Sequence, residues 1–237
     1  MIFDNVANNY FVSSDHRKGE DLDFCTHYFK NYHFKNSLDI ATGAGHFTKP
    51  FSASMKIATD ISFNMLKTAK EKVYLSHLVQ CVAKSLPFKE KSFDIVTCRI
   101  ALHHFKKPKL FFDEVYRILI EKGFFVLIDS IVDEDDSYLN VIEYIRDNSH
   151  RRSFTILEII EFTFNKFRLL TFHTIFKKHN FIEWATRLNQ DSTTVEKIEK
   201  AFLNLPEKIK EELNLEIHKN KVMSYTDKKG IFIFQKL

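Results

Sequence analysis

The chain alternates short, unbroken apolar segments with segments of helical periodicity. The apolar runs cover residues 37–41, 55–60, 77–82, 92–99 and 123–130, and helical patterns cover 46–53, 63–73 and 108–119. Short strands without polar alternation are typical of a parallel sheet that helices cover on both faces. We therefore predict an α/β fold built on a parallel sheet.

The regular alternation is lost after Asp129. Helical patterns follow over 138–146, 156–166, 181–189 and 193–213, the last divided by Pro206, with a strand over 167–177, a hairpin over 216–225 and a strand over 230–236. Residues 20–32 predict one further helix, near the N-terminus. Because no repeat or linker divides the chain, we predict a single domain over 1–237. It has an N-terminal segment that closes over a cofactor (1–35), a cofactor-binding core (36–130) and a helical cap with the C-terminal strands (131–237).

Composition excludes several classes of protein. The chain is 44% hydrophobic and 28% charged, as in ordinary globular domains, and no run of about 18 apolar residues could span a membrane. A net charge of +4 makes nucleic acid an improbable partner, and we expect no membrane partner either. The three cysteines stand singly and no signal peptide is evident, so we expect a cytoplasmic protein without a metal site, either monomer or homodimer.

One turn concentrates two of only five glycines. The strand containing Asp39 runs into Thr42-Gly43-Ala44-Gly45, and Asp60 ends the next strand. Glycines let a ligand approach bare backbone at the carboxyl end of a strand, and a carboxylate at the end of the following strand can accept hydrogen bonds from ribose hydroxyls. The pattern therefore predicts a site for a nucleotide-like cofactor.

A dinucleotide fits this turn poorly. The dinucleotide fingerprint needs a third small residue where this chain has Thr48, and its strand is usually the first element of the chain. S-adenosylmethionine, which carries no phosphate, is the other ligand that shares this geometry.

The order of the motifs resembles that of the class I S-adenosylmethionine-dependent methyltransferases. The likeness is strongest to the type 11 subgroup, which contains the ubiquinone/menaquinone C-methyltransferases, and it extends from Tyr10 to Asp129. Six segments carry it at the expected intervals, namely 38–45, 58–62, 86–88, 92–96, 98–105 and 114–119.

The resemblance implies a Rossmann-like sheet of seven strands in the order 3-2-1-4-5-7-6, with the last strand antiparallel, and a helical cap. It implies S-adenosyl-L-methionine as the cofactor, bound by Tyr10, Asp39, Ala41, Gly43, Gly45, Asp60, Ile61, Met65, Val82, Ala83, Lys84, Arg99 and Ile100. Val82 stands where many family members have the acid that accepts from the adenine amino group. Its absence removes one hydrogen bond, worth about 1 kcal/mol.

Candidate reactive groups follow the fourth strand. Methyl transfer needs orientation of the reactants, and it needs a general base only where the acceptor loses a proton. His103 and His104 leave that strand at the mouth of the predicted crevice, so we predict that one of them is the catalytic base. The cap supplies the predicted acceptor-binding residues, which are Asn148, His150, Arg152 and His173. They lie mostly in the segment 146–152, whose arginines could bind an acidic group on the acceptor. The many phenylalanines of the cap favour an apolar or aromatic-bearing acceptor.

The predicted function is methyl transfer from S-adenosylmethionine to a small-molecule acceptor. One alternative is O-methylation of a malonyl group on an acidic carrier protein, met by the basic pair Arg151 and Arg152. A second alternative is a non-catalytic, S-adenosylmethionine-binding regulatory protein, motivated by Val82. The sequence identifies neither the acceptor nor the atom that is methylated.

Overall fold

A single mixed sheet organises the computed structural model, which describes residues 6–133 and 138–237. Its strand order is β3-β2-β1-β4-β5-β8-β6, formed by β1 (Phe34–Ile40), β2 (Ala53–Asp60), β3 (His77–Gln80), β4 (Phe93–Arg99), β5 (Leu119–Ser130), β6 (Phe167–Asn180) and β8 (Lys221–Lys236). Strands β1 to β5 are parallel to one another, and β8 is antiparallel to both β5 and β6. With β8 as the seventh strand, the predicted order and the antiparallel last strand are confirmed. A short additional strand, β7 (Glu216–His218), pairs with β8.

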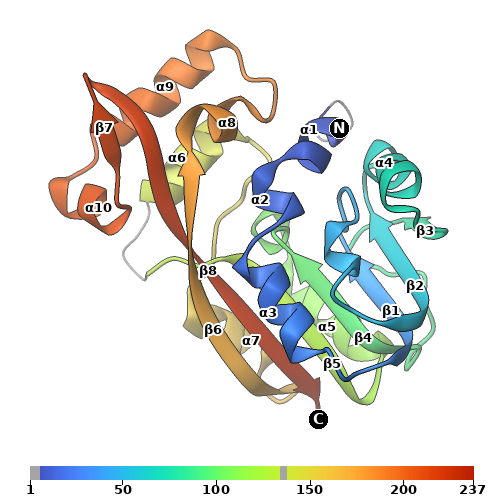
Figure 1. Ribbon diagram of the computed structural model, residues 1–237. Coiled ribbons are helices and arrows are strands. Elements are labelled where there is room, and N and C mark those ends of the chain that lie inside the picture. Colours follow the sequence, from blue (N-terminus) through green and yellow to red (C-terminus); the bar gives the residue numbers. More distant parts are fainter. Residues whose placement is uncertain (1–5, 134–137) are drawn as a thin grey trace.

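Helices cover both faces of the sheet because successive strand residues point to opposite sides. Val126 and Ile128 of β5 face α3 (Glu20–Tyr28), whose Cys25 is buried in the same cluster. Phe125 and Leu127 face the opposite side, which is covered by α5 (Pro108–Ile118) and α7 (Ile156–Thr163). Figure 1 shows α3 on one side of the sheet and α5 with α7 on the other. The remaining helix of the core, α4 (Phe63–Val73), packs against β2 and β3.

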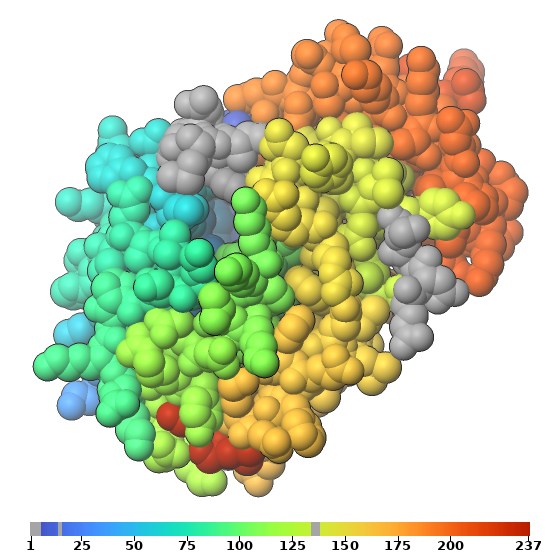
Figure 2. Space-filling model, turned by 180° about the vertical axis from the view of Figure 1, so that it is seen from behind, coloured from blue at the N-terminus to red at the C-terminus, as the bar shows by residue number. Residues whose placement is uncertain are grey.

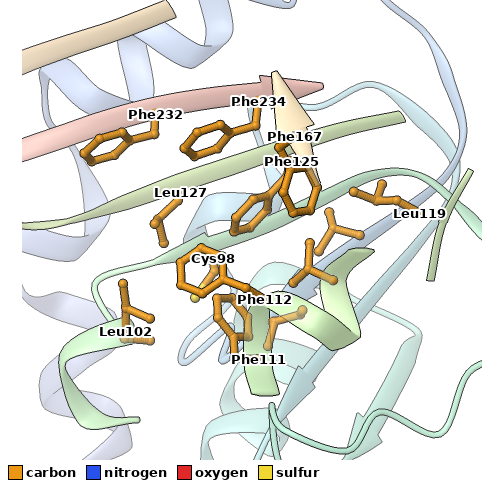
Figure 3. Close-up of a cluster of buried hydrophobic side chains, with 14 of the residues drawn as sticks. Cys98, Leu102, Phe111, Phe112, Leu119, Phe125, Leu127, Phe167, Phe232 and Phe234 are labelled. Carbon is orange, nitrogen blue, oxygen red and sulfur yellow. The ribbon is translucent and has the colours of Figure 1, made fainter. Parts of the chain in front are cut away.

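The larger core is rich in aromatic rings. Phe111 and Phe112 of α5 pack against Phe125, with ring centroids 5.9 Å away in both pairs, and Phe125 stacks on Phe234. Figure 3 shows these rings meeting between the helix and the strands. The many phenylalanines of the chain therefore serve chiefly to fill this interior, including Phe154 and Phe167 from the predicted cap.

A cap stands at one end of the sheet. Strands β6 and β8 extend beyond the others, and Figure 1 shows α6 (Tyr138–Arg146), α8 (Phe181–Thr186), α9 (Ser192–Leu203), α10 (Glu207–Glu212) and β7 gathered around that extension. The cap has an apolar cluster of its own, in which Trp184, Phe202 and Tyr225 are buried. The extension of β8 thus positions the cap over the carboxyl ends of the parallel strands.

The N-terminal segment bridges the cap and the core. It contains α1 (Ala7–Val12) and α2 (Ser14–Arg17). The Asn9 amide donates to the Arg187 carbonyl in the cap, at 2.9 Å. On the other side, Arg99 of β4 donates to the His16 carbonyl at 3.0 Å.

Two local predictions were wrong. The helix expected over 46–53 is a single 3₁₀ turn, His46–Thr48, because Pro50 lacks an N–H donor and β2 must begin at Ala53 to pair with Phe34. The hairpin strand and the final strand expected separately after Lys219-Asn220 are one continuous strand, β8, which pairs with β6 along its length. The helix over 63–73 begins and ends as predicted, and the Ser62 hydroxyl caps it by accepting from Met65 N.

Within residues 6–133 and 138–237, every helix is too short or too polar to cross a membrane.

Candidate active site

A cavity with about 1200 Å³ of empty volume, open solvent at its mouth included, lies between the carboxyl ends of the strands and the cap. This is where open α/β sheets bind their ligands. Most of the predicted cofactor residues and both predicted bases line it, namely Tyr10, Asp39, Ala41, Gly43, Asp60, Ile61, Met65, Arg99, Ile100, His103 and His104.

The two glycines of the turn are needed for different reasons. Both have left-handed backbone, with φ +53° at Gly43 and +87° at Gly45. A Cβ on Gly43 would meet no atom within 4 Å, so its backbone is open to the cavity. A Cβ on Gly45 would lie 3.0 Å from Leu75 and 3.2 Å from Ala69. Gly43 therefore leaves room for a ligand, whereas Gly45 permits close packing against α4.

The Asp60 carboxylate is fixed at the end of β2. Its Oδ2 accepts from Gly43 N at 2.9 Å and its Oδ1 from Ser62 N at 2.8 Å. Each carboxylate oxygen can accept more than one hydrogen bond, so the group can also bind ribose hydroxyls. An open glycine backbone beside a fixed carboxylate is the arrangement that S-adenosylmethionine requires, and these residues fit that cofactor.

Asp39 stabilises the turn through hydrogen bonds of its side chain. Its carboxylate accepts from the hydroxyls of Thr42 and Thr97, both at 2.6 Å. Burial raises its pKa to about 6, while the two hydroxyl hydrogen bonds act in the opposite direction. Asp39 thus holds the conformation of residues 42–45 as well as lining the cavity.

His103 is paired with a carboxylate that the sequence analysis missed. Its Nδ1 lies 2.6 Å from Oδ1 of Asp129, the penultimate residue of β5. Burial disfavours the imidazolium, but the charge of Asp129 and this hydrogen bond outweigh it, so the pKa of His103 is raised. Since a carboxylate only accepts, Nδ1 carries the proton and Nε2 is the ring nitrogen left for other chemistry.

Two further histidines pack around His103. The ring centroids of His104 and His150 lie 4.2 Å and 5.1 Å from that of His103. Burial lowers the pKa of His104 to about 3 and that of His150 to about 4, and the charge of His103 adds to both shifts. A ring with so low a pKa is a weak base near neutral pH. His103, whose pKa is raised, is therefore the stronger of the two predicted bases.

The cap reaches His103 through its backbone. Arg151 N donates to the His103 carbonyl at 2.8 Å, and the His150 ring bonds Asn140 Oδ1 at 3.0 Å. Figure 2 shows the cap segment around residue 150, in yellow, lying directly against the green segment that follows β4. His150, predicted to bind the acceptor, therefore packs against the His103 ring and is not among the residues that line the cavity.

Arg99 and Tyr10 tie the N-terminal segment to the cavity. The Arg99 guanidinium donates to Asp21 at 2.6 Å, and both side chains are buried. The Tyr10 ring lies 4.7 Å from that of His16, and both residues line the cavity. The closing role of residues 1–35 stays a prediction, and the structure describes this segment from Val6 onward.

The cap contributes charged groups, and all of them except Arg146, which begins the predicted acceptor-binding segment 146–152, were missed by the sequence analysis. Glu143 and Arg146 lie three residues apart on α6, and Lys229 and His179 both bond Asp227, at 2.8 Å and 3.0 Å. All five line the cavity. Their sequence signal was weak because a helix or strand that alternates charged and apolar residues ordinarily presents the charges to water.

Several predicted site residues lie outside the cavity lining. Val82, Ala83 and Lys84 form a turn after β3, closed by a bridge between Val82 and Ser85. Asn148 is exposed, Arg152 bonds Glu158 at the start of α7, and His173 stacks on Phe24 of α3. The cap phenylalanines Phe154, Phe162 and Phe172 pack in or against the main core. The roles predicted for these residues stay predictions, and the cavity wall contributed by the cap is more polar than its composition indicated.

Comparison with known proteins identifies the family. A methyltransferase domain family matches residues 38–127. The uncharacterized methyltransferase YcgJ of Bacillus subtilis is 35% identical over 166 residues, 66% of this chain and 66% of YcgJ. The ubiquinone/menaquinone biosynthesis C-methyltransferase UbiE of Pseudoalteromonas translucida is 29% identical over 145 residues, 54% of this chain and 57% of UbiE.

Similarity of structure extends further than similarity of sequence. The crystal structure of a Bacillus halodurans C-125 protein assigned to the methyltransferases has a TM-score of 0.86 and 27% identity, covering 92% of this chain and 99% of that protein. The likeness in structure therefore extends beyond the core to most of the chain. The chain belongs to the class I S-adenosylmethionine-dependent methyltransferases, whose methyl donor is S-adenosyl-L-methionine.

Proposed function

We propose that the protein methylates a small-molecule acceptor bound between the cofactor turn and the cap, with His103 as the general base. One observation carries the proposal: a single cavity is lined by Gly43 and Asp60 at one side and by His103 at another. A cofactor held at the turn and an acceptor held under the cap would therefore share one cavity.

The chain's own residues orient the reactants and handle the proton. S-adenosylmethionine, when bound, supplies an electrophilic methyl group on its sulfonium. The Gly43 backbone and the Asp60 carboxylate would hold the cofactor, and Asp129 holds the His103 ring with Nε2 available to accept a proton. The raised pKa of His103 makes its neutral form a stronger base than free imidazole.

The test separates binding from turnover. Calorimetry with S-adenosylhomocysteine, the demethylated product, should show saturable binding by the purified protein. Incubation with methyl-labelled S-adenosylmethionine and fractionated metabolites should then transfer label to a small molecule, and His103→Gln should abolish transfer while leaving S-adenosylhomocysteine affinity within about twofold. Binding without transfer to any fraction would favour the regulatory alternative.

Carrier-protein methylation is the alternative acceptor class. It depends on Arg151 and Arg152 meeting an acidic partner, and in the structure Arg152 bonds Glu158 and lies over the Phe154 ring. By contrast, His103, Asp60 and Arg146 are all buried around the cavity. This contrast supports a small molecule. Label transfer to a malonyl carrier protein, with none to free metabolites, would reverse the preference.

A further inference from the structure

Arg146, on the cap helix α6, lines the cavity and is 8% exposed. Its Nε and Nη2 both donate to Glu143 Oε2, at 3.1 Å and 2.7 Å. Its Nη1 is buried and has no hydrogen-bond partner among residues 6–133 and 138–237. One edge of the guanidinium is therefore fixed by Glu143, and the donors on Nη1 have no acceptor within the described protein.

Aromatic and cationic groups surround this guanidinium. It lies 4.5 Å from the ring centroid of Trp184, and Tyr10 and Arg187 line the same cavity. Burial raises the pKa of the Tyr10 phenol, while the charges of Arg146 and Arg187 act against that shift. Two guanidiniums therefore share one cavity with Tyr10 and Trp184, and that of Arg146 lies over the Trp184 ring.

A buried cationic donor without an acceptor is destabilising, because its desolvation is not compensated by a hydrogen bond. Carboxylate and phosphate oxygens are its strongest partners, because the hydrogen bonds are charge-assisted and the planar guanidinium can donate two at once. An aliphatic or aromatic acceptor without charge would leave the cost in place. The chemistry of the site therefore selects for an oxyanion.

We propose that Arg146, with Arg187 in the wall of the same cavity, binds an oxyanion of the methyl acceptor, a carboxylate or a phosphate, and that Trp184 and Tyr10 pack against the adjoining part of that molecule. The inference rests on the proposed function and specifies its substrate class. The oxyanion would lie in the same cavity as the proposed base, since Arg146 and His103 both line it.

The cofactor itself carries a competing oxyanion, its methionine carboxylate. If Arg146 bound that carboxylate, substitution of Arg146 would lower the affinity of the protein for S-adenosylhomocysteine. If it binds the acceptor, the cofactor product should bind normally and the site should remain accessible in its presence. The experiment is therefore done on protein saturated with S-adenosylhomocysteine.

Trp184 is the only tryptophan of the chain, and the Arg146 guanidinium lies over its ring. Its fluorescence therefore reports on changes around that guanidinium. Benzoate and phenyl phosphate serve as the two oxyanion probes, and benzamide is the neutral match for benzoate. We expect a saturable change in Trp184 fluorescence with benzoate or phenyl phosphate and none with benzamide. The anion that binds more tightly indicates whether the acceptor carries a carboxylate or a phosphate.

Two variants test the assignment to Arg146. Arg146→Lys retains the charge that compensates Glu143 but loses the planar fork, and the double variant Glu143→Gln/Arg146→Gln removes both buried charges together. Each should raise the half-saturating anion concentration at least tenfold, with S-adenosylhomocysteine affinity within about twofold of wild type. Arg168→Lys is the matched control, because Arg168 is an exposed residue of β6 whose guanidinium donates to Gln235 of β8.

The outcomes are distinct. No response to either anion in protein that binds S-adenosylhomocysteine would overturn the oxyanion site and leave the proposed function standing. Tenfold weaker S-adenosylhomocysteine binding by Arg146→Lys would also overturn it, by assigning the guanidinium to the cofactor. Failure of the wild type to bind S-adenosylhomocysteine would overturn the proposed function itself.

Discussion

His103 Nδ1 lies 2.6 Å from Asp129 Oδ1, and the two side chains are 11% and 2% exposed. The pairing joins the segment after β4 to the end of β5. Asp129 is held in turn by the backbone, accepting from Ala101 N at 3.1 Å and from Ser130 N at 2.7 Å. Adjacent parallel strands thus place a fixed carboxylate against a histidine 26 residues away, and this orients the imidazole toward the cavity.

The first prediction concerns the ionisation of this pair. Asp129→Asn removes the charge that opposes the burial effect, so the pKa of His103 should fall from above its ordinary value of 6.5 to below it. NMR titration of the histidine side chains, with the His103 signal assigned from the His103→Gln spectrum, measures the shift. An unchanged His103 pKa in the variant would mean that Asp129 does not set its basicity.

The same pair predicts a pH dependence of stability. The pKa of His103 is raised in the folded state, so its contribution is complete below about pH 6.5 and is lost as pH rises through the folded pKa. The pKa of Asp129 is lowered, so its contribution is present above about pH 4 and is lost as pH falls through the folded pKa. The difference in unfolding free energy between wild type and Asp129→Asn, from urea titrations, should therefore be largest between about pH 4 and about pH 6.5.

A second prediction concerns Asp60. Asp60→Asn keeps the size of the side chain but replaces one acceptor oxygen by an amide donor, which faces either Gly43 N or Ser62 N. We expect S-adenosylhomocysteine binding to weaken at least tenfold, about 1.4 kcal/mol, by calorimetry. Asp113→Asn is the control, since Asp113 pairs with Lys166 outside the cavity. Equal affinities for the two variants would remove Asp60 from the cofactor site.

A third prediction separates the two glycines. Gly45→Ala should lower the unfolding free energy by about 2–4 kcal/mol, because left-handed backbone costs about 1–2 kcal/mol and the added methyl overpacks Leu75 and Ala69. Gly43→Ala should incur only the backbone cost, about 1–2 kcal/mol, but should weaken S-adenosylhomocysteine binding more strongly, because its methyl enters the open cavity. Urea unfolding and calorimetry on both variants decide the matter, and the reverse ranking in either measurement would contradict it.

A fourth prediction concerns the buried ion pair between Arg99 and Asp21. Asp21→Asn leaves the Arg99 guanidinium buried without its counter-charge, which should cost about 3–5 kcal/mol of unfolding free energy. The double variant Asp21→Asn/Arg99→Met removes both charges and should be closer to wild type than the sum of the single variants. A double-mutant cycle by urea unfolding measures this coupling. Strictly additive costs would show that the two side chains do not stabilise each other.

Local sequence signals determined the elements of the core. The apolar runs, the Ser62 cap of α4 and the glycines of the turn act through near neighbours along the chain. The order of these elements matches a known family pattern. The strand order, and the edge of the sheet at which the cofactor is expected, follow from that pattern. Asp60 could be found for the same reason, because it ends a strand next to the one that leads into the turn.

Tertiary structure alone decided what faces the cavity from the cap. Whether Arg146 is buried depends on α6 lying against Trp184 and beneath the N-terminal segment, which involves residues far apart in the chain. The same holds for Asp129 beside His103 and for Lys229 beside Asp227 at the extension of β8. A charged side chain on a helix ordinarily faces water, and only the packing of three distant segments turns these charges inward. The sequence by itself therefore determined the fold and the methyl donor, while the charged lining of the cavity on the side of the cap arose from long-range packing.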